Sequence, residues 1–357
     1  MKIFEVNSNN MITQFLNVPV DLYKKNPNWT IQLGSDIEHA FIPEYNSLLS
    51  DGNAKRWLIY DEWNKPVGRI AGFYNKSEID YRGAFGFFEC KENYNCAATL
   101  LSTAIDWLKA QGCKSIEGPV NFGEKDRFWG VLTSGFDMPS LYLDNYNYPY
   151  YVDFFERFGL IEKDVIYTYK VEIVNIPGER IGRIAKRLEE REQITFKAFD
   201  FNNIEASATD LHQIYIHSFD QKKRFKHLSV QDIIQLIKSS RKVIDENLIW
   251  MAYKANTPIG LLAFMKDLNQ TLAFGRKRDS DEINLKGFAF SVVPEYRNHG
   301  IELGLCSSLY KKITINDEKY ALYFSGINSK TKQMDSFMKS LNASISKIHK
   351  TYTTNND

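Results

Sequence analysis

The stretch FAFSVVPEYRNHGIELGL, residues 288 to 305, carries the clearest structural signal of the chain. Its apolar run ends at Val293, and Pro294 stops the strand because proline has no backbone N–H to donate. Residues 297 to 300 then lead into a helical pattern that begins near Ile301. The first N–H groups of a helix lack intrahelical partners and lie at the positive end of the helix dipole. This order of strand, short loop and helix predicts a place where a diphosphate binds.

The elements around this stretch form a strand, helix, strand series at residues 286–293, 301–315 and 320–325. Such a series within about 40 residues is typical of a βαβ unit, whose strands pair in parallel. Two apolar runs, residues 249–253 and 258–264, precede it and are joined by the turn-rich KANT. We therefore expect a β-hairpin that continues into the βαβ unit.

The same order of elements occurs earlier in the chain, which indicates an internal repeat. Pro66 of the motif PVG recurs as Pro258 of PIG, 192 positions later. The strand-like residues 2–6 (KIFEV) find a partner in residues 195–199 (TFKAF), 193 positions later. The elements expected in the first copy are a hairpin at 56–61 and 66–73, a strand at 85–89, a helix at 97–111 and a strand at 115–118.

The repeat and the length of 357 residues both favour two domains, because one hydrophobic core seldom organises so long a chain. We expect an α/β (α+β) fold class, with a mixed antiparallel and parallel sheet flanked by helices in each domain. Residues 178–191 place apolar side chains at helical spacing among charges and predict a linking helix. The expected ranges are 1–176 for the N-terminal domain, 177–193 for the linking helix and 194–357 for the C-terminal domain.

The amino-acid composition indicates which partners and which cellular compartment to expect. Lys and Arg number 45 against 44 Asp and Glu, so no net positive field favours a nucleic acid or an anionic membrane. The first residues lack the apolar core of a signal peptide, and no window is apolar enough to span a bilayer. The 4 cysteines show no metal-binding spacing. We expect a cytoplasmic protein with no metal and no nucleic-acid or membrane partner, and the oligomeric state stays open.

The segment after residue 296 resembles the acyl-coenzyme A (acyl-CoA) loop of the GNAT acyltransferase superfamily. That loop has Arg or Gln, two residues, Gly, one residue, and then Gly or Ala. Arg297, Gly300 and Ile301 match, whereas Glu302 occupies the last small position. The order of elements resembles this superfamily across nearly the whole chain. The full-length arrangement looks like an uncharacterised bacterial group of tandem (double) GNAT-fold proteins.

The resemblance implies that acetyl-CoA or another acyl-CoA binds the C-terminal copy as a substrate. The pantetheine would pair with the strand at Phe290, Ser291 and Val292. The pyrophosphate would be held by the turn formed by Arg297, Asn298, His299, Gly300, Ile301, Glu302 and Leu303. We expect the Glu302 side chain to face solvent, because Ile301 should face the core as the helix begins. The first copy has no Arg-x-x-Gly motif at residues 90–95, so we expect no cofactor site there.

Candidates for acid and base chemistry are few. Many superfamily members use a tyrosine of the last helix as the acid, and the resemblance places Phe155 and Met338 at that position. Neither side chain can donate a proton, so an acid must come from elsewhere or the chemistry is absent. Glu117 and Glu124, in or beside the long loop of residues 118–148, are candidate general bases. Asn328 is a candidate to contact the substrate or to cap the following helix.

Three functions remain open from the sequence. The first is an acyl-CoA-dependent N-acyltransferase that acts on an unknown small-molecule amine or peptide. The second is a non-catalytic ligand-binding module that keeps the GNAT fold. The third is a Fem-type aminoacyl or peptidyl transferase, which also has two such domains.

Overall fold

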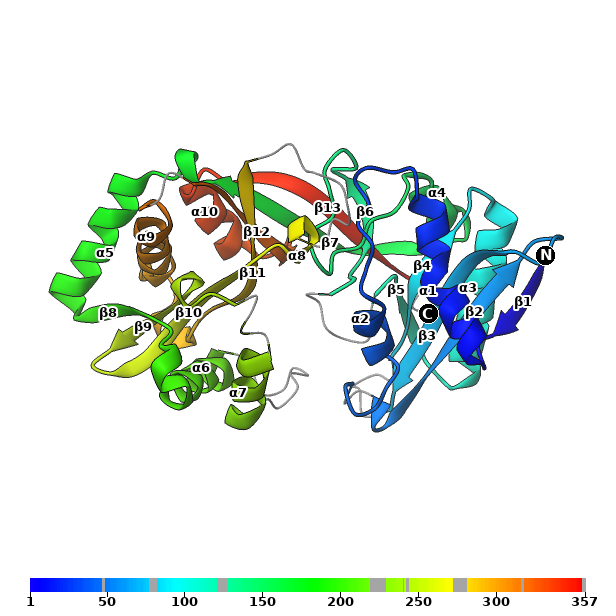
Figure 1. Cartoon of the computed structure of the whole chain (residues 1–357), viewed down its shortest axis with the longest axis horizontal. Helices are drawn as coiled ribbons and strands as arrows, with labels where there is room; N and C mark the ends of the chain where they lie inside the picture. The colour runs from blue at the N-terminus through cyan, green and yellow to red at the C-terminus, as the bar shows by residue number, and fades with distance from the viewer. Residues whose placement is uncertain are drawn as a thin grey trace. The chain divides into compact units, whose positions relative to one another are not determined.

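The chain folds into two compact units in the computed structural model. The structure describes residues 1–46, 49–76, 82–120, 127–218, 229–239, 241, 244–271, 281–315 and 318–354. Unit 1 contains Met1–Thr168, Gly326–Ser329 and Ser346–Asp357, and unit 2 contains Tyr169–Ser325 and Lys330–Ile345 (Figure 1). The expected domain ranges, with boundaries near residues 176 and 194, stay predictions about independent domains.

Unit 1 is built on an antiparallel meander of strands that continues into a βαβ unit. Its elements are β1 (Lys2–Glu5), α1 (Asn9–Tyr23), α2 (Gly34–His39), β2 (Gly52–Tyr60), β3 (Pro66–Asn75), β4 (Arg82–Cys90), α3 (Tyr94–Ala110), β5 (Ser115–Gly118), β6 (Val131–Ser134), α4 (Tyr150–Arg157) and the start of β7 (Ile161–Glu172). β2 pairs with β1 and β3, and β3 pairs with β4, all antiparallel. β5 pairs with β4 in parallel. The predicted hairpin and βαβ unit of the first copy are confirmed.

Successive side chains of β2 enter two different cores, because a strand presents its residues to alternate faces of the sheet. Trp57 and Ile59 pack into the core that also contains the apolar residues of α3 and α4. Leu58 and Tyr60 pack on the other face, with residues of α1 and α2. Unit 1 is therefore a sheet covered by helices on both faces.

The last strand of the chain, β13 (Ser344–Thr353), completes unit 1. Tyr352 lies opposite Gly118 of β5, and Ile348 lies opposite Ser134 of β6. Tyr352 is fully buried, and its ring lies 5.5 Å from that of Phe155 on α4. Tyr352, which lies more than 230 positions after the β5 strand that it pairs with, therefore belongs to the core of unit 1.

Unit 2 repeats the order of meander and βαβ unit. Its elements are the end of β7, η2 (Ile173–Asn175), α5 (Gly178–Glu192), β8 (Ile194–Ala198), η3 (Phe201–Asn203), α6 (Ile204–Ser218), α7 (Val230–Ser239), η4 (Glu246–Leu248), β9 (Ile249–Lys254), β10 (Thr257–Lys266), α8 (Leu268–Thr271), β11 (Glu282–Val292), η5 (Pro294–Tyr296), α9 (Ile301–Ile313), β12 (Lys319–Asn328) and α10 (Lys332–Ser340). β8 to β11 pair antiparallel in chain order, and β12 pairs with β11 in parallel. The predictions for these strands are confirmed, and α5 forms where a helix was expected, while its role as a link between domains stays a prediction.

Helices also cover both faces of the sheet in unit 2. Leu261 and Ala263 of β10 pack into a core with α6 and α7. Gly260, the residue before Leu261, faces α9, because a Cβ placed there would meet the side chains of Ile301 and Leu305. In the part of the chain that the structure describes, no helix has the length and apolarity needed to cross a bilayer.

Candidate functional site

The loop between β11 and α9 has the conformation that its sequence indicated. Pro294 opens the short turn η5 directly after the strand, and α9 starts at Ile301. Gly300 is the N-cap of α9 with a φ of 86°, a left-handed conformation that glycine adopts at low cost. Because Gly300 has no side chain, nothing from the N-cap residue itself covers the first turn of the helix. This end of α9 is suited to receive an anion.

β11 extends well beyond its pairing with β12. The parallel register runs from Glu282 opposite Lys319 to Lys286 opposite Tyr323, whereas β11 continues to Val292. The three strand residues expected to contact pantetheine lie in this extension and pair with β10 along their other edge; they are Phe290, Ser291 and Val292. Among the described residues, no strand is paired with the other edge of this extension, and an extended ligand could add main-chain hydrogen bonds at such an edge.

Aromatic rings pack against this extension of β11. The Phe290 ring stacks on Phe337 of α10, with centroids 5.0 Å apart and an interplanar angle of 18°. Phe324 of β12 lies edge-on to both rings, at 6.1 Å from Phe290 and 5.9 Å from Phe337. The side-chain face of the extension is thus apolar and is positioned by three elements of unit 2.

Arg297 holds the loop in shape. Its Nε donates to the carbonyl oxygen of Val292 at 3.0 Å, and its Nη2 donates to the carbonyl oxygen of Ser218 at 2.9 Å. The guanidinium therefore ties the end of β11 to the C-terminal end of α6. Its positive charge stays near the first turn of α9 and offsets in part the burial that raises the pKa of the Glu302 carboxyl.

Glu302 stands in the first turn of α9, where the loop motif usually has a small residue. Its side chain is half-buried, and its carboxyl accepts a hydrogen bond from its own backbone N–H. Burial raises the pKa of this carboxyl, although the hydrogen bond and the charges of His299 and Arg297 lower it in part. Ile301 is fully buried as expected. Glu302 is partly exposed, and the expectation that its side chain faces solvent stays a prediction. A charged Glu302 carboxylate here adds negative charge beside the first N–H groups of α9.

Two of the three candidate acid and base residues, Glu117 and Asn328, belong to unit 1. Glu117 of β5 in unit 1 forms an ion pair with Lys163 of β7. Asn328 also belongs to unit 1, where its Nδ2 donates to Asp164 at 3.0 Å. Glu124 lies outside the described residues. The two residues at the expected acid position, Phe155 and Met338, are completely buried.

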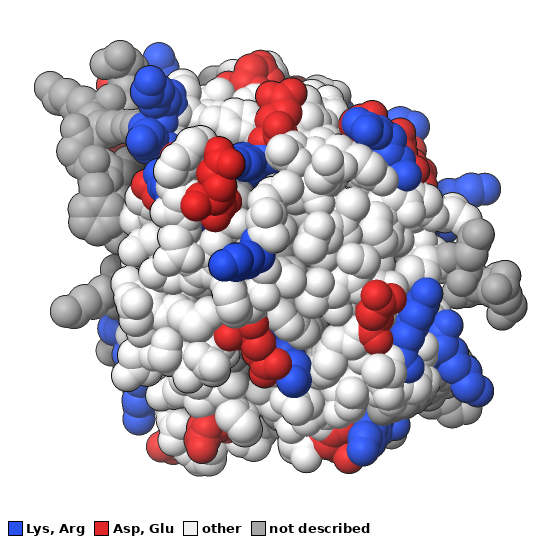
Figure 2. Space-filling view, turned by 90° about the vertical axis from the view of Figure 1, so that its right-hand side faces the viewer, with Lys and Arg blue, Asp and Glu red and all other residues white. Residues whose placement is uncertain are grey.

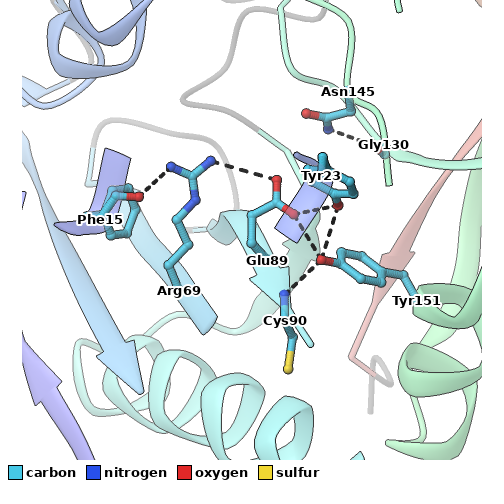
Figure 3. Close-up of polar contacts among 8 residues, drawn as sticks. All are labelled: Phe15, Tyr23, Arg69, Glu89, Cys90, Gly130, Asn145 and Tyr151. Carbon is cyan, nitrogen blue, oxygen red and sulfur yellow. Dashed lines mark hydrogen bonds and ion pairs between the residues drawn. The ribbon is translucent and has the colours of Figure 1, made fainter. Parts of the chain in front are cut away.

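Unit 1 contains a buried polar cluster that the sequence analysis missed (Figure 3). Glu89 of β4 accepts hydrogen bonds at Oε2 from the hydroxyl groups of Tyr23, at 2.7 Å, and Tyr151, at 2.9 Å. Its Oε1 lies 3.8 Å from Nη2 of Arg69 on β3. Arg69 also donates to the carbonyl oxygen of Phe15 at 2.8 Å. Residues from α1, two neighbouring strands and α4 thus converge on one carboxylate.

Burial dominates the electrostatics of this cluster. It raises the pKa of Glu89, and the charge of Arg69 and the two tyrosine hydroxyls lower it in part. Burial also lowers the pKa of Arg69 and raises those of Tyr23 and Tyr151, in each case because the charged form loses water. A carboxyl with a raised pKa next to bound hydroxyl groups is a common feature of functional sites, although structural ion pairs share it.

One sequence signal could have found this cluster. Arg69 and Glu89 are isolated charges within the apolar runs PVGRIAGF and FGFFEC, both of which are core strands. A buried charge normally requires a partner, so two such charges on neighbouring strands predict a pair. Tyr151 stands one helical turn before Phe155 in the run YPYYVDFF, close to the position that the resemblance assigned to an acid.

Charges of both signs are scattered over the surface of unit 1 (Figure 2). In that view most of the described surface is neither acidic nor basic, and no single sign gathers into a broad patch. The near-equal totals of 45 basic and 44 acidic residues agree with this distribution. A long polyanion therefore finds no electrostatic footprint on the described part of this face.

Comparisons with known proteins give the fold. No protein-family model matches the chain. A tandem GNAT protein from the clavulanic acid biosynthesis pathway superposes on 100% of this chain and 98% of its own with a TM-score of 0.59, at 9% sequence identity. The chain has a tandem GNAT fold. The GCN5-related glucosamine N-acetyltransferase region of a fungal multi-domain β-N-acetylglucosaminidase covers 99% of this chain and 38% of that chain, with a TM-score of 0.58 and 11% identity.

One curated relative in sequence has a named activity. The bacterial ceramide synthase of Caulobacter vibrioides is 23% identical over 279 residues, which are 76% of this chain and 72% of that protein. A second relative, protein YghO of Escherichia coli, is 20% identical over 278 residues, or 74% of this chain and 68% of its own length.

In unit 1 the end of β4 and the start of α3 correspond to the β11–α9 site of unit 2, and side chains of unit 1 already bind the backbone there. Asn93 caps α3 through its side chain, which accepts from Cys96 N at 3.0 Å. At the end of β4, Cys90 N donates to the Tyr151 hydroxyl at 2.8 Å, and the Tyr150 hydroxyl donates to Cys90 O at 2.9 Å. The helix N-terminus and both backbone groups of Cys90 are therefore already bonded within the unit.

Proposed function

We propose that this protein is an acyl-CoA-dependent N-acyltransferase whose donor binds unit 2. The observation that carries the proposal is the extension of β11 beyond its pairing with β12, followed by the glycine-capped start of α9. The extension offers main-chain groups to the pantetheine, and the helix start offers N–H groups to the pyrophosphate. The tandem GNAT fold supports this assignment, since its named structural neighbours include N-acetyltransferases.

Each residue of the loop would have a separate role in holding the donor. Phe290, Ser291 and Val292 would present their backbone edge to the pantetheine, and Arg297 keeps the turn in place through its two carbonyl contacts. Gly300 would let phosphate approach the helix backbone, because only hydrogen stands at its Cα. The thioester supplies the acyl group, so the new N–C bond to the amine forms as the C–S bond breaks and the thiol departs.

The name of one relative suggests the class of acceptor. A ceramide is an amide of a fatty acid and a long-chain amino alcohol, and the Caulobacter relative is a ceramide synthase. We therefore propose a long-chain amino alcohol as the first acceptor to test, with palmitoyl-CoA and acetyl-CoA as donors. Small amines and a peptide amine complete the panel, and free thiol is the measured product.

Two substitutions at Gly300 test the donor site. Gly300→Asn and Gly300→Asp add nearly the same bulk at a φ of 86°, and their Cβ would meet Ile184 at 3.3 Å in both cases. Only aspartate adds a negative charge where phosphate approaches. We expect calorimetry to show at least a tenfold weaker acyl-CoA affinity for Gly300→Asp than for Gly300→Asn, and most strongly at low salt. Equal affinities in the two folded variants would contradict this site.

A non-catalytic binding module is the second candidate, and Glu302 is the observation that favours it. A half-buried carboxylate beside the first N–H groups of α9 opposes the charge of a diphosphate. Titration with acyl-CoA separates the candidates when it is combined with the thiol assay. Binding without thiol release across the acceptor panel supports the module, and release that depends on an amine supports the transferase.

A further inference from the structure

The helices α5 and α9 of unit 2 lie side by side and run in opposite directions (Figure 1). A Cβ placed on Gly178, the first residue of α5, would meet the ring of Tyr310 near the end of α9 at 2.7 Å. Cγ2 of Ile184, in the middle of α5, would meet a Cβ on the N-cap glycine of α9 at 3.3 Å. Oε2 of Glu192, the last residue of α5, lies 3.9 Å from Nδ1 of His299. The second half of α5 therefore continues past the start of α9, beside the turn proposed to hold the pyrophosphate.

Two arginines of this second half lie on the side of α5 that contacts the start of α9. An α-helix turns by 100° and rises by 1.5 Å per residue, so Arg187 and Arg191 stand about 60° and about 20° around the helix from Ile184. They also lie about 4.5 Å and about 10 Å further along its axis. Both side chains are exposed. Lys186 and Glu190 lie on the other side of the helix and pair with each other at 3.6 Å, and among the described residues neither arginine forms an ion pair.

This end of α5 is held firmly in unit 2. Ala185 and Leu188 are buried, and Nζ of Lys254 on β9 donates a hydrogen bond to the carbonyl oxygen of Glu192. The two arginines therefore extend from a fixed backbone, so a ligand that they bind does not have to order the helix.

The donor turn itself offers little side-chain positive charge to a phosphate. The guanidinium of Arg297 donates to two main-chain carbonyl groups, and Glu302 places a carboxylate in the first turn of α9. CoA has a diphosphate at the 5′ position of its ribose and a further phosphate at the 3′ position of the same sugar. A ligand with this much negative charge is bound best where cations stand beyond the turn, and guanidinium groups match the geometry of phosphate oxygens.

We propose that Arg187 and Arg191 of α5 bind the 3′-phosphate of the acyl-CoA donor. The proposal rests on the proposed function, because it extends the donor site from the α9 turn to the helix that runs beside it. It makes α5 a recognition element that favours CoA over a thioester of phosphopantetheine, which has no 3′-phosphate. Both arginines are exposed, so we expect this contribution to weaken as the salt concentration rises.

The test compares CoA with 3′-dephospho-CoA by calorimetry at low salt. We expect the wild-type protein to bind CoA at least fivefold more tightly than dephospho-CoA, and Arg187→Gln/Arg191→Gln to bind the two ligands equally. Glutamine keeps the helix propensity, and the affinity of this variant for dephospho-CoA should stay within about twofold of wild type. That second affinity shows that the variant is folded.

Arg180→Gln/Arg183→Gln is the matched control. It removes the same charge from the same helix, but in the half of α5 that lies toward Gly178 and the end of α9, and both side chains are exposed. The control should keep the preference for CoA within about twofold of wild type. Equal wild-type affinities for the two ligands would overturn the proposal. A preference that survives in Arg187→Gln/Arg191→Gln, or one that is lost equally in the control, would also overturn it.

Failure of this proposal is distinguishable from failure of the proposed function. If wild type binds CoA and dephospho-CoA equally, and Gly300→Asp weakens both relative to Gly300→Asn, the donor site stands and the arginine site fails. Adenosine 3′,5′-bisphosphate, which has no pantetheine, gives the reverse case. If it binds wild type but not Arg187→Gln/Arg191→Gln, and CoA does not bind, the arginine phosphate site stands and the acyl-CoA proposal fails. Binding of none of these ligands contradicts both.

Discussion

At the proposed donor site, we expect the Glu302 charge to weaken the binding of a diphosphate. The half-buried carboxyl of Glu302 accepts the N–H of its own residue, one of the groups that would otherwise face a phosphate. We expect Glu302→Gln to raise the affinity for acyl-CoA by about tenfold at low salt, because it removes the charge and keeps the size. Glu295→Gln is the control, since Glu295 is exposed in the preceding turn. A similar change in both variants by calorimetry would count against a local effect.

The same residue predicts a pH dependence of donor binding. Burial raises the pKa of Glu302, so the carboxyl becomes neutral at a higher pH than an exposed glutamate. Acyl-CoA affinity should therefore rise as the pH falls through this pKa, and Glu302→Gln should lose that part of the profile. His299 and Arg297 face the carboxyl, and Glu192 of α5 lies 3.9 Å from His299.

His299 lies beside the same carboxyl, so His299→Gln is the control. A pH profile of acyl-CoA affinity in Glu302→Gln that still equals the wild-type profile would contradict the prediction.

The free energy of unfolding should depend on pH in the same direction as donor binding. A raised pKa in the folded state means that the contribution of Glu302 is fully present below its unfolded pKa and is lost as the pH rises through the folded value.

At the scale of elements, α4 closes the end of β4 through two tyrosine hydroxyls on Cys90. Tyr151→Phe leaves the buried N–H of Cys90 without this partner and removes one donor from Glu89. We expect a loss of about 1–3 kcal/mol in the free energy of unfolding by urea titration. Tyr150→Phe should cost less, because the Tyr150 hydroxyl bond is only partly buried. A larger loss for Tyr150→Phe than for Tyr151→Phe would contradict this assignment of the two hydroxyl contacts.

Elements with a strong local pattern could be predicted from the sequence, and contacts between distant segments could not. The hairpin at Pro258 and the turn at Pro294 follow from alternation and from proline within a few residues, and both are confirmed. The cluster at Glu89 joins residues 66 and 62 positions away, so no local period indicates it. The partial burial of Glu302 depends on the packing around α9, which helical spacing alone does not give.

At the scale of the whole molecule, the two units are not simply the first and second halves of the sequence. Residues 346–357 close the sequence but belong to unit 1, and Tyr352 packs in the same core as Phe155 and Tyr151. A fragment that ends near the expected boundary at residue 176 lacks this strand. We therefore expect such a fragment to fold poorly by itself, because β5 and β6 lose their partner.

Tyr352→Ala tests, in the intact chain, whether β13 stabilises unit 1. Removing a fully buried ring should lower the stability of unit 1 by about 3–5 kcal/mol, since the cavity lies in its main core. Ile345→Ala in the same strand is the control, because Ile345 is 46% exposed and belongs to unit 2, and about 0.5 kcal/mol or less is expected. Hydrogen exchange should report the loss as faster exchange in β2, β3 and β5, with β9 and β10 unchanged. If protection fell equally in β9 and β10, Tyr352 would stabilise both units rather than the core of unit 1 alone.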